Sequence, residues 1–211
     1  MKNLKIILAA LISLLPLNIL RVMGYRLLGY KMQNAHIGFG TIIAVEAAIL
    51  ESCRIGPFNI FAGPMKIQIH QGASIGNRNE FICGYWVLRD EYTGAHYARS
   101  LEVCDEALIT SRHYFDLSGA LVLGARSWIA GIDSQFWTHG AGVTDRDIKI
   151  GTDCYIGSGV RFSPGSSIGN HIVVAMGSVV SGEMPENNAL IGGVPAKVLK
   201  SNYNWKDKDA R

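Results

Sequence analysis

The stretch Ile150–Ser181 reads IGTDCYIGSGVRFSPGSSIGNHIVVAMGSVVS, and its bulky apolar residues recur at every sixth position. They are Ile150, Ile156, Phe162, Ile168, Val174 and Val180. A period of six is neither the 3.6 residues of an amphipathic helix nor the simple alternation of a half-buried strand. It predicts a larger repeating unit.

The same period runs through most of the chain. Upstream it covers Ile37, Ile43, Ile49, Ile55, Phe61 and Ile67; after a slip of two residues it covers Ile69, Ile75 and Phe81, and later Val103, Ile109, Phe115, Leu123 and Ile129. A unit of this size can form one short strand and one corner, and three units close a triangular coil whose apolar residues stack on those of the next coil. The sequence therefore predicts an all-β solenoid of parallel strands.

Length and composition indicate one ordered domain. The chain has 211 residues, of which 48% are apolar and 18% are charged, so it can bury a sizeable core. Its net charge of +3 is small for a nucleic-acid-binding protein, and we expect no nucleic-acid partner. The four cysteines form no C-x-x-C pair, which favours buried thiols in a reducing compartment over a zinc site or disulfides.

The N-terminal segment 1–33 differs from the rest of the chain. Its apolar run Ile6–Leu20 contains Pro16, is flanked by Lys and Arg, and is followed by no acidic residue before Glu46. The run is shorter than the ~20 residues that span a bilayer as a helix, and no small-residue cleavage site follows it. Two alternatives stay open: a helix that packs on the body or on another subunit, and a monotopic segment that lies on an anionic membrane face.

The closing sequence GSVVSGEMPENNALIGGVPAKVLK, Gly177–Lys200, together with the I-G-x4 repeats, resembles the hexapeptide-repeat acyltransferases. The chain is most similar to the sugar O-acetyltransferases of polysaccharide and nodulation-factor pathways, over Ala35–Lys200. This resemblance implies a left-handed parallel β-helix over residues 34–200, a C-terminal tail over 201–211, and a homotrimer with active sites between subunits.

Two interruptions of the repeat are expected to contain or border the active-site residues, since insertions into a regular solenoid often have a functional role. They are the segments 83–100 and 140–149, and His139 lies directly before the second. Acetyl transfer requires a base that removes a proton from the acceptor hydroxyl, which suits a neutral imidazole. In the family that this chain resembles, the base is a histidine before such a loop, which implies His139.

The resemblance also implies acetyl-CoA as co-substrate and no metal. The matching positions for the coenzyme are Ser158, Met176, Ser181, Gly182, Lys197 and Lys200. Gly182 departs from the pattern, because relatives commonly carry a lysine there. A backbone N–H near Ser158 is the predicted donor to the oxyanion of the tetrahedral intermediate.

The predicted acceptor-binding residues are His113, Asp116, Trp137 and Asp133. For His113, acceptor binding, a structural hydrogen bond and a catalytic role remain open. Asp133 can orient the imidazole of His139 or cap a turn, and Trp137 can stack on a sugar ring or pack on a neighbouring subunit.

The sequence thus predicts a cytoplasmic O-acetyltransferase that acts on a sugar or saccharide precursor of a surface polysaccharide. If residues 1–30 lie on the inner membrane face, the protein is peripheral there and a lipid-linked saccharide becomes a candidate acceptor. A non-catalytic β-helix scaffold is the alternative. A metalloenzyme like the γ-class carbonic anhydrases is disfavoured, because the sequence lacks the H-x4-H spacing of their ligands.

Overall fold

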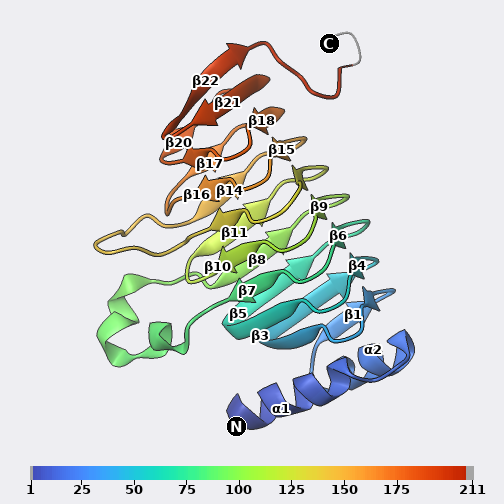
Figure 1. Ribbon diagram of the computed structural model, residues 1–211. Helices are drawn as coiled ribbons and strands as arrows, with labels where there is room; N and C mark the ends of the chain where they lie inside the picture. Colours follow the sequence, from blue (N-terminus) through green and yellow to red (C-terminus); the bar gives the residue numbers. More distant parts are fainter. Residues whose placement is uncertain (1, 208–211) are drawn as a thin grey trace.

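The computed structural model describes residues 2–207, which form short parallel strands wound in a stack of three-sided coils with two helices at the N-terminal end (Figure 1). Each strand pairs with the equivalent strand of the next coil, as β13 pairs with β16. This arrangement satisfies the backbone along the whole stack, while alternate side chains of each strand point inward. The parallel β architecture predicted from the six-residue period is confirmed.

Three faces make up each coil. The first contains the N-terminal halves of β3 (Ile42–Glu51) and β5 (Ile60–Ile69), then β7 (Glu80–Ile82), β10 (Tyr114–Asp116), β13 (Gln135–Phe136), β16 (Arg161–Phe162) and β19 (Val179–Val180). The second contains β1 (Lys31–Gln33), the C-terminal halves of β3 and β5, β8 (Ser100–Val103), β11 (Ala120–Leu123), β14 (Ile148–Ile150), β17 (Ser167–Ile168) and β20 (Glu183–Met184). The third contains β2 (His36–Ile37), β4 (Arg54–Ile55), β6 (Ser74–Ile75), β9 (Leu108–Ile109), β12 (Trp128–Ile129), β15 (Tyr155–Ile156), β18 (Ile172–Val174), β21 (Ala189–Gly193) and the antiparallel β22 (Ala196–Ser201).

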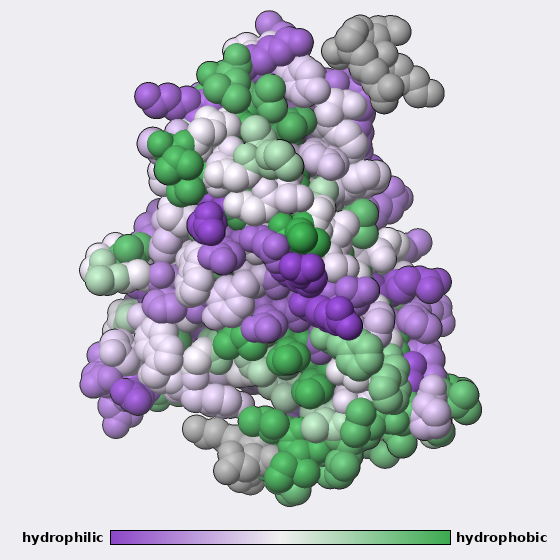
Figure 2. Space-filling view, viewed as in Figure 1, coloured by the Kyte–Doolittle hydropathy of each residue, from purple (hydrophilic) through white to green (hydrophobic). Residues whose placement is uncertain are grey.

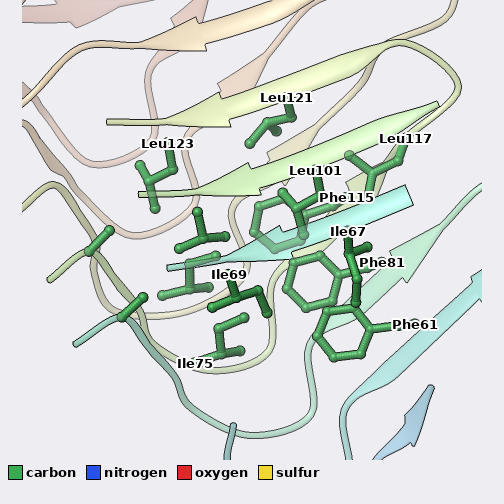
Figure 3. Close-up of a cluster of buried hydrophobic side chains, with 14 of the residues drawn as sticks. Phe61, Ile67, Ile69, Ile75, Phe81, Leu101, Phe115, Leu117, Leu121 and Leu123 are labelled. Atoms are coloured by element: carbon green, nitrogen blue, oxygen red, sulfur yellow. The ribbon is translucent and has the colours of Figure 1, made fainter. Parts of the chain in front are cut away.

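A column of phenylalanines runs up the interior along the first face. The rings of Phe61, Phe81, Phe115, Phe136 and Phe162 are fully buried, and consecutive ring centroids lie 4.3, 4.4, 4.7 and 5.1 Å apart. Figure 3 shows the first three of these rings among the aliphatic side chains of the other faces. The spacing is close to the distance between neighbouring strands, so the column keeps successive coils in register.

One position of the predicted register is wrong. Ile49 was expected to point inward, but it is half-buried and Leu50 is fully buried instead. The pairing of β3 with β5 shifts between Val45 and Ala47, and this irregularity moves the inward position by one residue.

The N-terminal segment forms α1 (Lys2–Ser13) and α2 (Asn18–Leu27), which cover the open end of the first coil (Figure 1). The hydroxyl of Tyr25 donates to Thr41 O at 2.6 Å, and Nε of Arg21 donates to Ile37 O at 2.9 Å. Packing of this segment on the body is therefore observed. Within residues 2–207, no helix is long and apolar enough to span a membrane.

The two interruptions of the repeat protrude from the same side of the stack (Figure 1). The first contains two 3-10 helices, η1 (Tyr85–Leu88) and η2 (Asp90–Ala95).

At the C-terminal end the chain folds back on the third face, where Trp205 donates to Asp153 O at 2.7 Å. The four cysteines are free, and burial raises the pKa of Cys53, Cys83, Cys104 and Cys154.

Candidate active site

His139 lies where the chain leaves β13 and enters the second insertion. Its side chain is 39% exposed, and its Nδ1 lies 2.9 Å from Oδ1 of Asp116, whose side chain is 7% exposed. The two atoms are close, but the contact lies off the N–H direction of a regular hydrogen bond. Because Nδ1 faces a carboxylate, the tautomer with its proton on Nδ1 is favoured, and Nε2 is then the atom that can accept a proton.

Asp116 reaches this position because β10 pairs in register with β13, one coil later. The hydroxyl of the buried Thr138 lies 2.8 Å from Asp116 O and 3.0 Å from its Oδ1, and it accepts a hydrogen bond from Gly119 N–H at 2.8 Å. These contacts hold the carboxylate still. The Asp116 side chain is buried against His139, so its observed contact is with the imidazole, and contact of Asp116 with the acceptor stays a prediction.

Aromatic side chains surround the imidazole on two sides. The ring centroid of Trp86, from η1, lies 5.3 Å from that of His139, and the centroid of Trp137 lies 6.4 Å from it. Trp137 is half-buried and packs on Tyr114 with ring centroids 5.0 Å apart. Aromatic side chains next to a polar group can stack on the carbon-bound face of a sugar ring, so the predicted stacking role of Trp137 stays a prediction.

Arg146 joins the two insertions. Its guanidinium lies 4.1 Å from the ring centroid of Tyr97, and it donates to Ala95 O at 3.1 Å and to Val143 O at 2.7 Å. Tyr97 in turn packs edge-on against Trp86 with centroids 5.3 Å apart. Arg146 therefore links the second insertion to Tyr97, which packs on the Trp86 that lies beside His139.

His113 has a different environment from His139. It is 2% exposed, its Nδ1 accepts a hydrogen bond from Ser134 N–H at 3.1 Å, and its Nε2 lies 3.0 Å from Oγ1 of Thr110. Burial lowers the pKa of His113 to about 4, while Asp133 opposes this shift. Both ring nitrogens are engaged inside the coil, so the structural alternative fits His113 and acceptor binding does not.

The side chain of Asp133 contacts Arg112 and not the imidazole of His139. It has a left-handed backbone conformation at a coil corner and pairs with Arg112 at 3.3 Å, with both side chains about half exposed. The interpretation of Asp133 as a turn residue is therefore favoured over a role in orienting the base.

The predicted coenzyme residues divide between two corners of the stack. Ser158 and Met176 lie on consecutive coils at the corner between the third and first faces, where Gly177 N–H donates to Ser158 O at 2.9 Å. Ser181 and Gly182 follow β19, at the corner between the first and second faces where His139 lies two coils earlier. Within one chain, Ser158 and His139 lie at opposite ends of the first face.

The two predicted lysines lie on β22. Lys197 is exposed, and Nζ of Lys200 lies 5.0 Å from the ring centroid of Tyr203. Neither lysine is near His139 in the contacts of this chain. Across residues 2–207, no three His, Cys, Asp or Glu side chains gather in a group that could hold a metal ion.

Several residues of this site were not predicted from the sequence. They are Trp86, Tyr97, Thr138 and Arg146. Trp86 and Tyr97 lie in the first insertion, which the break in the repeat had identified as functional without indicating which side chain faces the histidine. Thr138 carried a signal, because it directly precedes His139 in the segment that follows β13, where buried and less buried residues alternate.

Comparisons with known proteins concern the fold and part of the sequence. No protein-family model matches the sequence. The chain is 46% identical over 61 residues to WbbJ of Escherichia coli strain K12, which is provisionally named as a lipopolysaccharide biosynthesis O-acetyl transferase. The matched segment covers 29% of this chain and 30% of WbbJ. It is also 39% identical over 61 residues to the galactoside O-acetyltransferase of the same strain. This matched segment covers 29% of each chain. The aligned segments thus span less than a third of these relatives.

Solved structures share the fold. The polySia-specific acetyltransferase NeuO aligns with a TM-score of 0.60 at 19% identity, over 86% of this chain and 84% of NeuO. The hexapeptide-repeat acetyltransferase VCA0836 of Vibrio cholerae, in complex with acetyl coenzyme A, aligns with a TM-score of 0.53 at 19% identity, over 96% of this chain and 89% of that one. In fold the chain resembles hexapeptide-repeat acetyltransferases, and over part of its sequence it resembles O-acetyltransferases.

Proposed function

We propose that this protein is an O-acetyltransferase that moves the acetyl group of acetyl-CoA to a hydroxyl of a saccharide in surface polysaccharide biosynthesis. The observation that carries the proposal is the contact of His139 with the buried Asp116, next to two tryptophans. The similarity in sequence to O-acetyltransferases supports the same reaction class.

His139 serves as general base in this reaction. Its Nε2 takes the proton of the acceptor hydroxyl as the oxygen forms a bond to the thioester carbonyl carbon. The tetrahedral intermediate then breaks its carbon–sulfur bond, and the proton passes from the imidazolium to the leaving thiolate. Asp116 keeps the ring in one orientation and stabilises the imidazolium, because a buried carboxylate 2.9 Å away attracts the developing positive charge.

The division of the coenzyme residues between two corners supports a homotrimer. A coil face of about six residues at ~3.3 Å per residue separates Ser158 from the corner of His139 by roughly 20 Å. A second subunit that places its Ser158 and Met176 corner beside the His139 corner would complete the site. The coils wind left-handed in this proposal, as the resemblance to hexapeptide-repeat acyltransferases implies.

We place the protein in the cytoplasm, at the inner face of the membrane, with its N-terminal helices toward the lipid. Residues 1–45 contain five Lys or Arg and no Asp or Glu, and this positive charge favours binding to an anionic membrane surface. Coenzyme A is available on that side of the membrane.

The test is the release of free thiol from acetyl-CoA over a panel of mono- and disaccharides, by the wild type and by His139→Ala. We expect turnover to fall about 1,000-fold in the variant, while acetyl-CoA binding measured by calorimetry persists. Turnover that is equal in both proteins would exclude His139 as base, and absence of coenzyme binding would favour the scaffold alternative.

Mixed oligomers test the shared site. Two inactive variants, His139→Ala and Ser158→Trp, are unfolded together and refolded, so that some subunit interfaces pair an intact His139 with an intact Ser158. Recovered turnover supports a site between subunits, whereas two variants that stay inactive on mixing would mean that each chain holds its complete site.

A further inference from the structure

A large apolar groove lies between the N-terminal helices and the first insertion. It has a volume of about 590 Å³ and is lined mainly by carbon atoms. Its lining includes Leu4 and Leu8 of α1, Leu27 at the end of α2, and Tyr85 and Leu88 of η1. A volume in this range is typical of ligand-binding sites in proteins.

The groove and His139 lie on different sides of one 3-10 turn. In a 3-10 helix, residues three apart share a face, so Tyr85 and Leu88 both point into the groove while Trp86 points elsewhere. Trp86 is the residue whose ring lies 5.3 Å from that of His139. Neighbouring residues of η1 therefore contact the groove on one side and the histidine on the other.

The groove opens at a surface suited to a membrane. Figure 2 shows apolar residues gathered over the N-terminal helices. Leu11, Leu14, Leu17, Ile19 and Met23 are each more than half exposed there. Lys5 and Glu46 both line the groove, and Nζ of Lys5 is 4.7 Å from the ring centroid of Tyr30, while the two helices themselves carry basic residues and no acidic one. Apolar side chains with basic neighbours are the pattern of a surface that contacts anionic lipid.

We infer that this groove binds the hydrocarbon chain of a lipid-linked saccharide, so that the acceptor enters the active site from the membrane with its sugar beside Trp86 and His139. The inference rests on the proposed acetyl transfer for the identity of the acceptor headgroup. It adds a binding site for the lipid part of the substrate, and it assigns Leu8 and Leu88 to that site.

The position of the groove favours the acceptor over the acyl chain of the donor. The groove contains Val45 and Gly63, which belong to the first coils of the stack. The predicted coenzyme residues Ser158 and Met176 follow β15 and β18, on the C-terminal side of His139. Donor and acceptor therefore approach the histidine from opposite ends of the stack.

The experiment measures binding of dodecyl maltoside, below its critical micelle concentration, and of maltose, by calorimetry on the full chain. We expect the alkyl chain to tighten binding about 100-fold or more, because several methylene groups become buried. Leu8→Arg and Leu88→Arg, which lie on two different elements of the groove, should remove this gain. Leu11→Arg is the matched control, since Leu11 lies on the same helix, is 60% exposed and does not line the groove.

Binding is measured without acetyl transfer, so the result stands apart from the turnover test of the proposed function. Equal binding of dodecyl maltoside and maltose by the wild type would overturn the inference, as would an equal loss of the gain in all three variants. Palmitoyl-CoA binding that depends on Leu8 and Leu88 would assign the groove to the donor instead. A wild-type oligomer that Leu8→Arg dissociates, with no effect of the alkyl chain, would assign it to a second copy of the protein.

Discussion

Two histidines at different corners of the stack show how one residue type takes two roles. His113 lies at the corner between the third and first faces, is 2% exposed, and has both ring nitrogens engaged by its own chain. His139 lies one coil later, at the corner between the first and second faces; it is 39% exposed and faces one buried carboxylate and two tryptophans. The first histidine is followed directly by strand β10, whereas an insertion follows the second. An interrupted repeat leaves a side chain open to a substrate, whereas a continuous one encloses it.

The largest expected effect is a difference in kcat between variants of the two histidines. His139→Gln should reduce kcat about 1,000-fold with little change in melting temperature, because a half-exposed base is lost and no core contact is removed. His113→Gln should change kcat by less than about 3-fold while the protein stays folded, and should lower the melting temperature because Ser134 N–H loses its acceptor. Thiol-release kinetics and thermal melts on both variants measure this contrast. A reversed pattern would exchange the two roles.

The second effect is the pH dependence of stability. The pKa of His113 is about 4 in the fold, below the ordinary value of 6.5, because burial disfavours the charged ring. The unfolded chain therefore binds this proton more readily, and the contribution of His113 to stability is complete above pH 6.5 and is lost as the pH falls toward 4. The full loss is about 3 kcal/mol, at 1.36 kcal/mol per pH unit.

Urea unfolding of the wild type and of His113→Gln at pH 7, 6 and 5 measures this contribution. The difference in unfolding free energy between the two proteins should shrink as the pH falls. A difference that is constant across this range would mean that His113 does not titrate as its burial requires.

The third effect distinguishes two carboxylates. Asp116→Asn should lower kcat about 100-fold with KM nearly unchanged, since it removes the charge that orients His139 and stabilises its imidazolium. Asp133→Asn is the matched control and should alter kcat by less than about 2-fold, because Asp133 pairs with Arg112 at a partly exposed corner. Equal losses in both variants would contradict the assignment of Asp116 as the positioning residue.

The smallest effect concerns the attachment of the first insertion. Arg146→Lys keeps the charge but loses the two-pronged contact with Ala95 O and Val143 O, so we expect kcat/KM to fall only a few-fold. Trypsin should cleave at Arg89 faster in the variant, because the insertion opens more often. An unchanged cleavage rate together with unchanged kinetics would show that Arg146 does not hold the insertion in place.

Much of the fold could be predicted because the signal is local. One bulky residue in six points inward, and that period is visible in any short window of the repeats. The prediction of Ile49 failed where an irregularity in β3 shifts the register, which leaves no mark in the apolar pattern. His139 could be singled out because it directly precedes an insertion, and its selection as base remains a prediction.

By itself, the sequence determined that this chain forms stacked parallel coils, because inward positions repeat at short range and their burial drives folding. Only the tertiary structure decided which carboxylate meets His139, that His113 is enclosed, and that η1 separates an apolar groove from the active site. Asp116 and His139 are brought together by the pairing of β10 with β13, and Trp86 by an insertion whose course no repeat specifies. Such contacts depend on strand register and loop packing between distant segments, which a local pattern of burial does not encode.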